Sequence, residues 1–330
     1  MMKYEIFREV VADTFRNYLP EEYKNMEMKI VSVNKVNRMM DGINLIGNGE
    51  KAVSPTIYIN DMYDHYTLCN DLQEAIQSGA DRMVKAFEKC PEVPTIGFAE
   101  AKDNIVFQLV NTEQNREMLA EVPHREFQDL SIIYRLVVKV DAEGIQSTVV
   151  KNGLAEQLGL NEEQLFKLAA ENTRRIFPPC IKSMNEVLLE MFEKDGMPRE
   201  IAEMMLGEMP ADRMMYVISN DRGINGAISM LYEDKLHSLA MELENDLYIL
   251  PSSVHEVIAV SVDMGEPYEL AQMVSEINMD QVALEERLSN QVYHYDKDLR
   301  KVSLATDTPN KRLDGIVAEP PMVYEAKQSR

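Results

Sequence analysis

Apolar side chains recur with two different spacings along this chain, and the order of the segments that show each spacing limits the folds it can adopt. Residues 29–36 alternate between apolar and polar positions, as a β-strand with one buried face does. Residues 4–19 and 162–176 instead show the three- and four-residue apolar spacing of an amphipathic helix. Because runs of strands are separated by runs of helices, the sequence predicts an α+β fold with mostly antiparallel sheets.

A long helical block divides the chain into parts. It predicts an N-terminal α+β part over 1–150, a helical connector over 151–210 and a C-terminal α+β part over 211–305, unless these form one continuous fold. Within the connector, residues 180–194 have helical spacing. Residues 306–330 contain three prolines and few aliphatic side chains, which predicts a mobile tail.

Two turn signals predict β-hairpins in the N-terminal part. Asp41 and Gly42 should connect the strand over 29–36 to a second strand at 43–46. Residues 141–144, with the sequence Asp-Ala-Glu-Gly, should connect two longer strands.

The chain is strongly acidic, with 56 acidic and 34 basic residues and a formal charge of −22. Such a surface repels nucleic-acid phosphates and anionic membranes, so we expect no direct binding to either. It favours a protein partner with a basic surface. The alternative of an acidic DNA mimic would need dense stripes of carboxylates. Here acids and bases mix, as where Lys167 follows Glu162 and Glu163.

The pattern of apolar runs and cysteines bears on the compartment. No apolar run approaches the ~20 residues that span a bilayer, and the N-terminal residues are charged, unlike a secretory signal. Cys69, Cys90 and Cys180 are scattered and include no CxxC pair. This pattern is neither a disulfide framework nor a zinc site, and it predicts a cytoplasmic protein.

Motifs that hold cofactors or metals are missing from the sequence. The glycine-rich GxGxxG and Walker A loops that cradle phosphates do not occur. The HExxH zinc motif and the GxSxG nucleophile elbow are missing as well. We therefore expect no cofactor and no metal, and the sequence favours a protein that is not an enzyme.

The most distinctive short segment is residues 250–256, with the sequence Leu-Pro-Ser-Ser-Val-His-Glu. Ser253 beside His255 could form a nucleophile and base pair. Residues at such a turn more often bond backbone groups, so a structural role is the stronger alternative. If a strand begins near Val254, alternation places His255 and Glu256 on opposite faces.

A second candidate lies in the loop before residue 130. His124 with Asp129 could form an oriented general base, and a loop ion network is the alternative. A hydrolase would require His124 and His255 to converge in one pocket.

A third cluster mixes aromatic and polar side chains at a strand-to-helix junction. Its members are Tyr58, Tyr63, His65 and Tyr66. Such a mixture suits contact with a protein or a small ligand, and a packed junction is the alternative.

Several phrases of the chain resemble an uncharacterised family of bacterial domain-of-unknown-function proteins from gut Firmicutes. They occur in a fixed order over about residues 5–300, at 54–60, 122–130, 215–227, 250–258 and 285–295. The resemblance implies a bacterial cytoplasmic protein. It transfers no activity and no catalytic residue.

Three functions remain open from the sequence. The favoured one is a non-enzymatic binding or regulatory protein that acts through protein–protein contacts. The second is a hydrolase that uses His255 or His124 with a nearby Ser253 and carboxylates. The third is the acidic DNA mimic.

Overall fold

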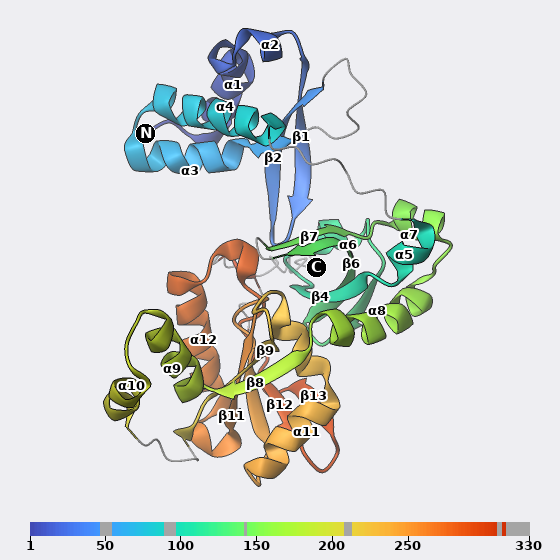
Figure 1. Cartoon of the computed structure of the whole chain (residues 1–330), viewed down its shortest axis with the longest axis vertical. Helices are drawn as coiled ribbons and strands as arrows, with labels where there is room; N and C mark the ends of the chain where they lie inside the picture. The colour runs from blue at the N-terminus through green and yellow to red at the C-terminus, as the bar shows by residue number, and fades with distance from the viewer. Residues whose placement is uncertain (47–54, 89–96, 142–143, 208–212, 309–311, 315–330) are drawn as a thin grey trace, which may run out of the picture. The chain divides into compact units, whose positions relative to one another are not determined.

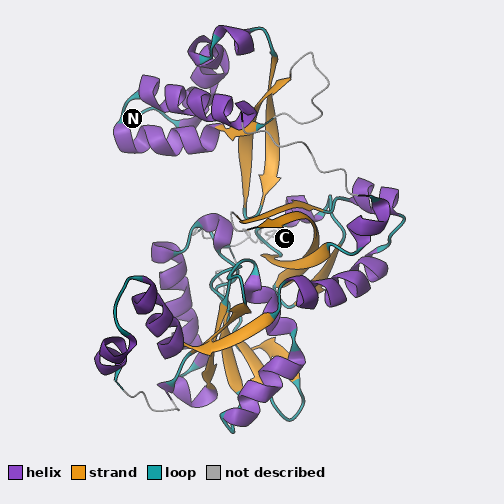
Figure 2. Cartoon of the chain, viewed as in Figure 1, coloured by secondary structure: helices purple, strands orange, loops and turns teal. Residues whose placement is uncertain are grey.

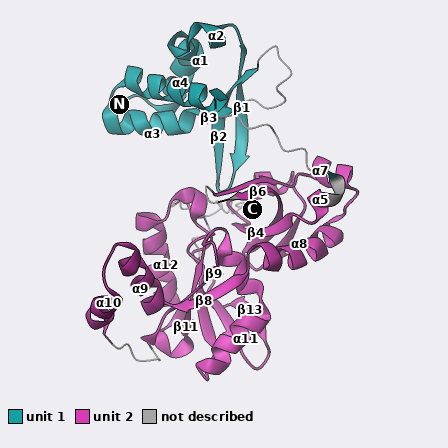
Figure 3. Cartoon of the chain, in the orientation of Figure 1, with its two compact units in different colours: residues 1–97 teal, residues 98–330 magenta. Residues whose placement is uncertain are grey.

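The computed structural model describes residues 1–46, 55–88, 97–141, 144–207, 213–308 and 312–314. The chain divides into two compact units, Met1–Gly97 and Phe98–Arg330 (Figure 3). The boundary that the sequence suggested at 150 falls inside the second unit. It falls there because strand β7 (Gly144–Val149), just before it, and helix α8 (Glu162–Ile176), after it, belong to or contact one sheet.

The first unit packs helices against a three-stranded antiparallel sheet (Figures 1 and 2). Its core contains Phe7, Ile43, Met62 and Ile76, all without exposed surface. In chain order its elements are α1 (Tyr4–Thr14), η1 (Phe15–Tyr18), α2 (Glu21–Lys24), β1 (Glu27–Lys35), β2 (Arg38–Ile46), β3 (Thr56–Tyr58), α3 (Ile59–Cys69) and α4 (Leu72–Glu88).

The first hairpin turns at a different place from the one predicted. Lys35 pairs with Arg38, and Asn37 takes up the left-handed conformation at φ 63°. Asparagine tolerates this conformation better than most residues. Gly42 lies inside β2, where a Cβ would come within 2.5 Å of Thr56 on β3. The glycine therefore permits a close strand approach, and the turn prediction at this position was wrong.

The second unit begins with a four-stranded antiparallel sheet. The central strand β6 pairs with β4, β5 and β7, and helix α8 lies against β4. The predicted antiparallel pairing of the strands on either side of residues 141–144 and the helix over 162–176 are confirmed. Residues 142 and 143 lie outside the described residues. The elements are α5 (Phe98–Lys102), β4 (Ile105–Asn111), α6 (Arg116–Leu119), β5 (His124–Phe127), β6 (Leu130–Asp141), β7 (Gly144–Val149), α7 (Asn152–Leu158) and α8 (Glu162–Ile176).

The rest of the second unit is a six-stranded antiparallel sheet in the order β13-β12-β10-β11-β9-β8. Helix α12 covers one face, where Leu270 and Val274 pack near Leu250 and Val260. The elements are β8 (Pro179–Ser183), α9 (Met184–Lys194), α10 (Arg199–Leu206), β9 (Tyr216–Asn220), η3 (Gly226–Leu231), α11 (Glu233–Glu242), β10 (Leu247–Leu250), β11 (Val257–Ser261), η4 (Val262–Met264), α12 (Pro267–Gln281), η5 (Leu284–Glu286), β12 (Tyr293–Asp296) and β13 (Lys301–Leu304). The α+β fold with antiparallel sheets is confirmed.

The predicted helix over 180–194 is a strand followed by a helix. Ser183 begins the helix, because its hydroxyl accepts a hydrogen bond from the Glu186 amide at 3.2 Å. The residues before Ser183 pair with β9 at the edge of the sheet. Pairing with a distant strand has overridden the local helical spacing there.

The described part of the predicted tail is packed against the second unit. Thr306 is buried, and its hydroxyl accepts a hydrogen bond from the Val292 amide at 2.9 Å. Leu313 is 1% exposed, and its carbonyl accepts a hydrogen bond from Arg287 at 2.6 Å. Residues 309–311 and 315–330 lie outside the described residues.

Candidate functional site

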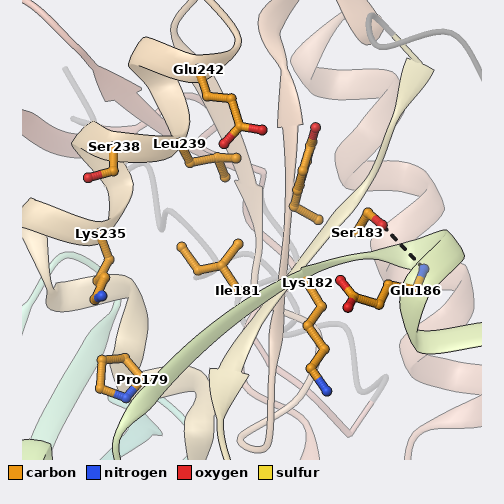
Figure 4. Close-up of a pocket in the computed structure, with 10 residues that line it drawn as sticks. Pro179, Ile181, Lys182, Ser183, Glu186, Lys235, Ser238, Leu239 and Glu242 are labelled. Carbon is orange, nitrogen blue, oxygen red and sulfur yellow. Dashed lines mark hydrogen bonds between the residues drawn. The ribbon is translucent and has the colours of Figure 1, made fainter. Parts of the chain in front are cut away.

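A groove of about 500 Å³ lies beside β8, where β9 and helix α11 form its other walls (Figure 4). Ile181 and Leu239 contribute its apolar lining, and Tyr216 lies opposite Ser183 on the neighbouring strand. The groove therefore follows the outermost strand of the six-stranded sheet.

The hydrogen-bond ladder fixes which backbone groups of β8 are directed outward. The Asp221 amide bonds to the Pro178 carbonyl at 3.1 Å, and the Met184 amide bonds to the Met215 carbonyl at 2.8 Å. Along an antiparallel strand, the amide and carbonyl of one residue face the partner strand, and those of the next residue face away from it. The even-numbered residues of β8 therefore bond to β9, and the odd-numbered residues direct their backbone groups toward the edge that no described strand pairs with.

Charged side chains are unevenly distributed along this groove. Lys182 is held by Glu190 of α9, with Nζ to carboxylate distances of 2.6 and 2.8 Å. This hydrogen bond raises the pKa of Lys182 and lowers that of Glu190. Burial and the nearby Glu242 raise the pKa of Tyr216. Glu242 lines the end of the groove away from Pro179 (Figure 4).

Helices α9 and α10 follow directly from β8 and leave large apolar side chains in solvent. Helix α9 has no fully buried residue, and α10 buries only Ala202. The exposed side chains are Met191 (55%), Ile201 (50%), Met204 (83%) and Met205 (65%). We call these two helices with their exposed apolar side chains the Met hairpin. Grouped apolar exposure of this kind marks interaction surfaces more often than single exposed residues do.

The Met hairpin is bordered by negative charge. Residues 184–207 contain six carboxylates, at Glu186, Glu190, Glu193, Asp195, Glu200 and Glu203, and two cations, at Lys194 and Arg199. Arg199 pairs with Glu203 at 3.0 Å and with Glu193 at 3.5 Å, and Lys182 pairs with Glu190. With Lys182 counted, carboxylates still exceed cations by six to three. The border therefore favours a cationic surface.

The segment 250–256 holds two loops together. The Val254 amide donates to the Glu286 carbonyl at 2.8 Å, and the Val254 carbonyl accepts from the Ala227 amide at 3.2 Å. Strand β11 begins at Val257, so the condition for strand alternation at His255 and Glu256, a strand that starts near Val254, is not met. The backbone bonds to the 225–227 and 286–289 loops occupy these residues instead.

Ser253 and His255 are engaged with other groups in this segment. The Ser253 hydroxyl accepts the backbone amide of His255 at 2.9 Å. Nδ1 of the His255 ring accepts the Asn225 amide at 3.2 Å, and Nε2 lies 3.4 Å from Glu286. Since Nδ1 acts as the acceptor, the neutral ring carries its proton on Nε2, facing Glu286. Burial raises the pKa of the adjacent Glu256 carboxyl.

His124 and Asp129 contact different parts of the second unit. Nδ1 of His124 lies 3.0 Å from the Val122 carbonyl. Asp129 accepts a hydrogen bond from Ser289 at 2.6 Å and another from Tyr293. Burial raises the pKa of Tyr293 well above its ordinary value. Asp129 thereby connects the four-stranded sheet to the six-stranded sheet.

The aromatic cluster predicted as a contact patch holds the N-terminal residues in the first unit. Tyr63 donates a hydrogen bond to the Met2 carbonyl at 2.8 Å, and the Met2 amide donates to Tyr66 at 3.2 Å. Lys35 lies over the Tyr58 ring, 5.1 Å from its centroid. His65 borders a small groove, with Nε2 3.8 Å from Glu74.

Sequence reasoning missed the groove and the Met hairpin. Local spacing gave no signal for the hairpin, because Ile201, Met204 and Met205 have the i, i+3, i+4 spacing that also marks a helix face buried in a core. The free edge of β8 left no local signal. In the part of the chain that the structure describes, His, Cys, Asp and Glu side chains form no group that could hold a metal ion. No helix there has both the length and the apolar character that crossing a membrane requires.

Comparison with known proteins gives one match. The model of a family of unknown function (DUF5688) matches residues 4–297. No curated protein and no solved structure matches the chain.

Proposed function

Because the chain belongs to the family of unknown function DUF5688, whose description names no activity, we propose a function from the site alone. The protein is a non-enzymatic binding protein that recognises a basic protein partner through the Met hairpin. The partner contributes an amphipathic helix with apolar side chains on one face and Lys or Arg beside them.

One observation carries this proposal: large apolar side chains stand in solvent on two neighbouring helices inside an acidic border. Met204 and Met205 are the most exposed of them. Methionine side chains are flexible and polarizable, so they adapt to apolar surfaces of varied shape. Helix-in-groove recognition uses apolar anchors of this kind, and complementary charge sets the register and the association rate.

The two alternative functions draw less support from the same structure. A hydrolase would use Ser253 and His255, yet the Ser253 hydroxyl bonds to the histidine backbone amide and the ring accepts from a backbone amide. An acidic DNA mimic would present carboxylates in place of phosphates, and exposed methionines such as Met204 have no counterpart in a phosphate backbone.

The proposal is tested by titrating the full chain with a labelled helical peptide of leucine and lysine, about 18 residues long. The double change Met204→Glu and Met205→Glu should weaken binding about tenfold, or ~1.4 kcal/mol, because charge replaces apolar contact. Met273→Glu is the matched control, since Met273 is also exposed on a helix of the second unit. Fluorescence anisotropy measures each dissociation constant.

A second peptide separates specific docking from general attraction to an acidic protein. It has the same composition, with D-residues placed to prevent helix formation. It should bind more weakly than the helical peptide. Added salt should weaken the binding of both peptides, but the ratio of their dissociation constants should stay above one, because salt does not screen apolar contacts. Equal binding of both peptides, or equal loss in the Met204/Met205 and Met273 variants, would rule the proposal out.

A further inference from the structure

The free edge of β8 carries backbone groups that an added strand could use. Of its odd-numbered residues, Pro179 has no amide hydrogen and Ser183 caps helix α9. Ile181 therefore offers both an outward amide and an outward carbonyl. Neither group has a hydrogen-bond partner among the described residues, and no other described strand pairs with this edge.

The groove lies on the same side as the Ile181 side chain. Side chains alternate along a strand, so those of Pro179, Ile181 and Ser183 share one face, and all three line the groove. Lys182 also borders the groove, but alternation directs its side chain away from that of Ile181, and Glu190 holds its Nζ at 2.6 Å. An added strand could therefore bond to Ile181 while its own side chains enter the groove.

The groove has opposite charges at its two ends. Glu186 lies at the Ser183 end, since its amide donates to the Ser183 hydroxyl at 3.2 Å. Figure 4 shows Glu242, which also lines the groove, at the end away from Pro179. Lys235 lines the groove two helical turns before Glu242, about 10 Å away. Figure 4 shows Lys235 beside Pro179, at the other end. The lining therefore favours a ligand with a positive and a negative end.

We propose that β8 is a second docking site, which takes an extended segment of a partner protein as an added antiparallel strand. Antiparallel pairing matches every other ladder of the sheet. It places the N-terminal half of the segment near Ser183 and the C-terminal half near Pro179. The segment accordingly has basic residues in its first half, acidic residues in its second half and apolar side chains at alternate positions.

This site goes beyond the proposed function, because it recognises the backbone of an extended segment and not the apolar face of a helix. The two sites can therefore be tested separately. A displayed library of random peptides, about 12 residues long, is selected on the full chain carrying Met204→Glu and Met205→Glu. The Met hairpin is thereby removed as a source of binders.

The decisive variant is Ile181→Pro. It removes the outward amide while the β8–β9 ladder keeps its bonds, because edge strands tolerate proline at outward positions. Ile181→Val is the matched control, since it keeps the amide and an apolar side chain. Selected peptides should bind the proline variant about tenfold more weakly and the valine variant almost unchanged.

A second measurement does not depend on the folding of the proline variant. N-methylation of the peptide at single positions should weaken binding at every second residue, since only alternate amides of an added strand face β8. A selected set that binds Ile181→Pro as tightly as Ile181→Val, or that tolerates N-methylation everywhere, would overturn the proposal. So would a selection that enriches no peptide. None of these results would affect the helical-peptide test of the Met hairpin.

Discussion

At the residue scale, Gly226 shows how tightly the segment 250–256 is fixed. A Cβ at this position would lie 2.6 Å from the His255 carbonyl and 2.7 Å from the Asn220 amide nitrogen. Both are backbone atoms, so neither can move without shifting a loop. The distinctive phrase around His255 is therefore constrained by packing with a loop about thirty residues earlier in the chain.

Replacing Gly226 by alanine should lower the free energy of unfolding by about 2 kcal/mol, because the added methyl group overlaps backbone atoms. Urea unfolding followed by circular dichroism measures the change. Gly153→Ala is the control, since a Cβ there has no neighbour within 4 Å. It should be neutral or slightly stabilising in helix α7. Similar values for the two variants would contradict the packing seen around Gly226.

At the element scale, one charged cluster attaches helix α8 to the four-stranded sheet. Arg125 on β5 donates to both carboxylate oxygens of Glu162, at 3.0 and 2.8 Å. Its guanidinium also lies over the Phe166 ring, 3.8 Å from the centroid. Tyr134 of β6 donates a further hydrogen bond to Glu162. Helix α8 is thus fixed by residues from two strands.

The pKa of Glu162 predicts how this attachment responds to acid. Burial acts to raise the pKa of this carboxyl, but Arg125 and Tyr134 outweigh burial and hold it below the ordinary value of 4.5. A carboxyl whose pKa is lowered by folding stabilises the folded state. This contribution is fully present at pH values above the pKa of the carboxyl in the unfolded chain, and it is lost as the pH falls through its pKa in the folded chain. The attachment should therefore weaken below about pH 4.5.

Glu162→Gln should lower the free energy of unfolding at pH 7 by about 1 kcal/mol, because it removes a partly exposed charged pair. The difference from the unchanged chain should shrink as the pH falls below the ordinary carboxyl pKa. Unfolding curves at pH 7 and at acid pH measure both effects. A difference that stays constant with pH would show that the charge of Glu162 is not what fixes α8.

At the scale of the whole molecule, hydrogen bonds of buried and half-buried polar residues join the two sheets of the second unit. Asp129, in the turn after β5, accepts hydrogen bonds from Ser289 and Tyr293. Ser289 lies just before β12, and Tyr293 is the first residue of β12. Asn111 at the end of β4 donates to the Leu288 carbonyl at 3.2 Å. Removing one partner of such a buried bond leaves a polar group without compensation.

Asp129→Ala should therefore lower the free energy of unfolding of the second unit by about 2 kcal/mol. His124→Ala should have a smaller effect, since His124 is partly exposed and its ring contacts a neighbouring carbonyl. Thermal unfolding of both variants provides the comparison. Equal effects would contradict the larger structural role that the hydrogen bonds from Ser289 and Tyr293 give to Asp129.

The sequence by itself determined the elements whose decisive contacts are local. Helical spacing and a capping box at Asn161 are enough to specify α8, because each involves residues three or four apart. The hairpin around residues 141–144 is equally local. Composition likewise established the acidic character of the chain.

Tertiary structure decided whatever depends on residues far apart in the chain. Residues 180–183 have a helical pattern, yet they form a strand because β9, more than thirty residues later, supplies hydrogen bonds. The exposure of Met204 and the free edge at Ile181 depend on which elements fail to cover them. A local pattern shows which side chains are apolar, but only the assembled fold determines which of them remain in water.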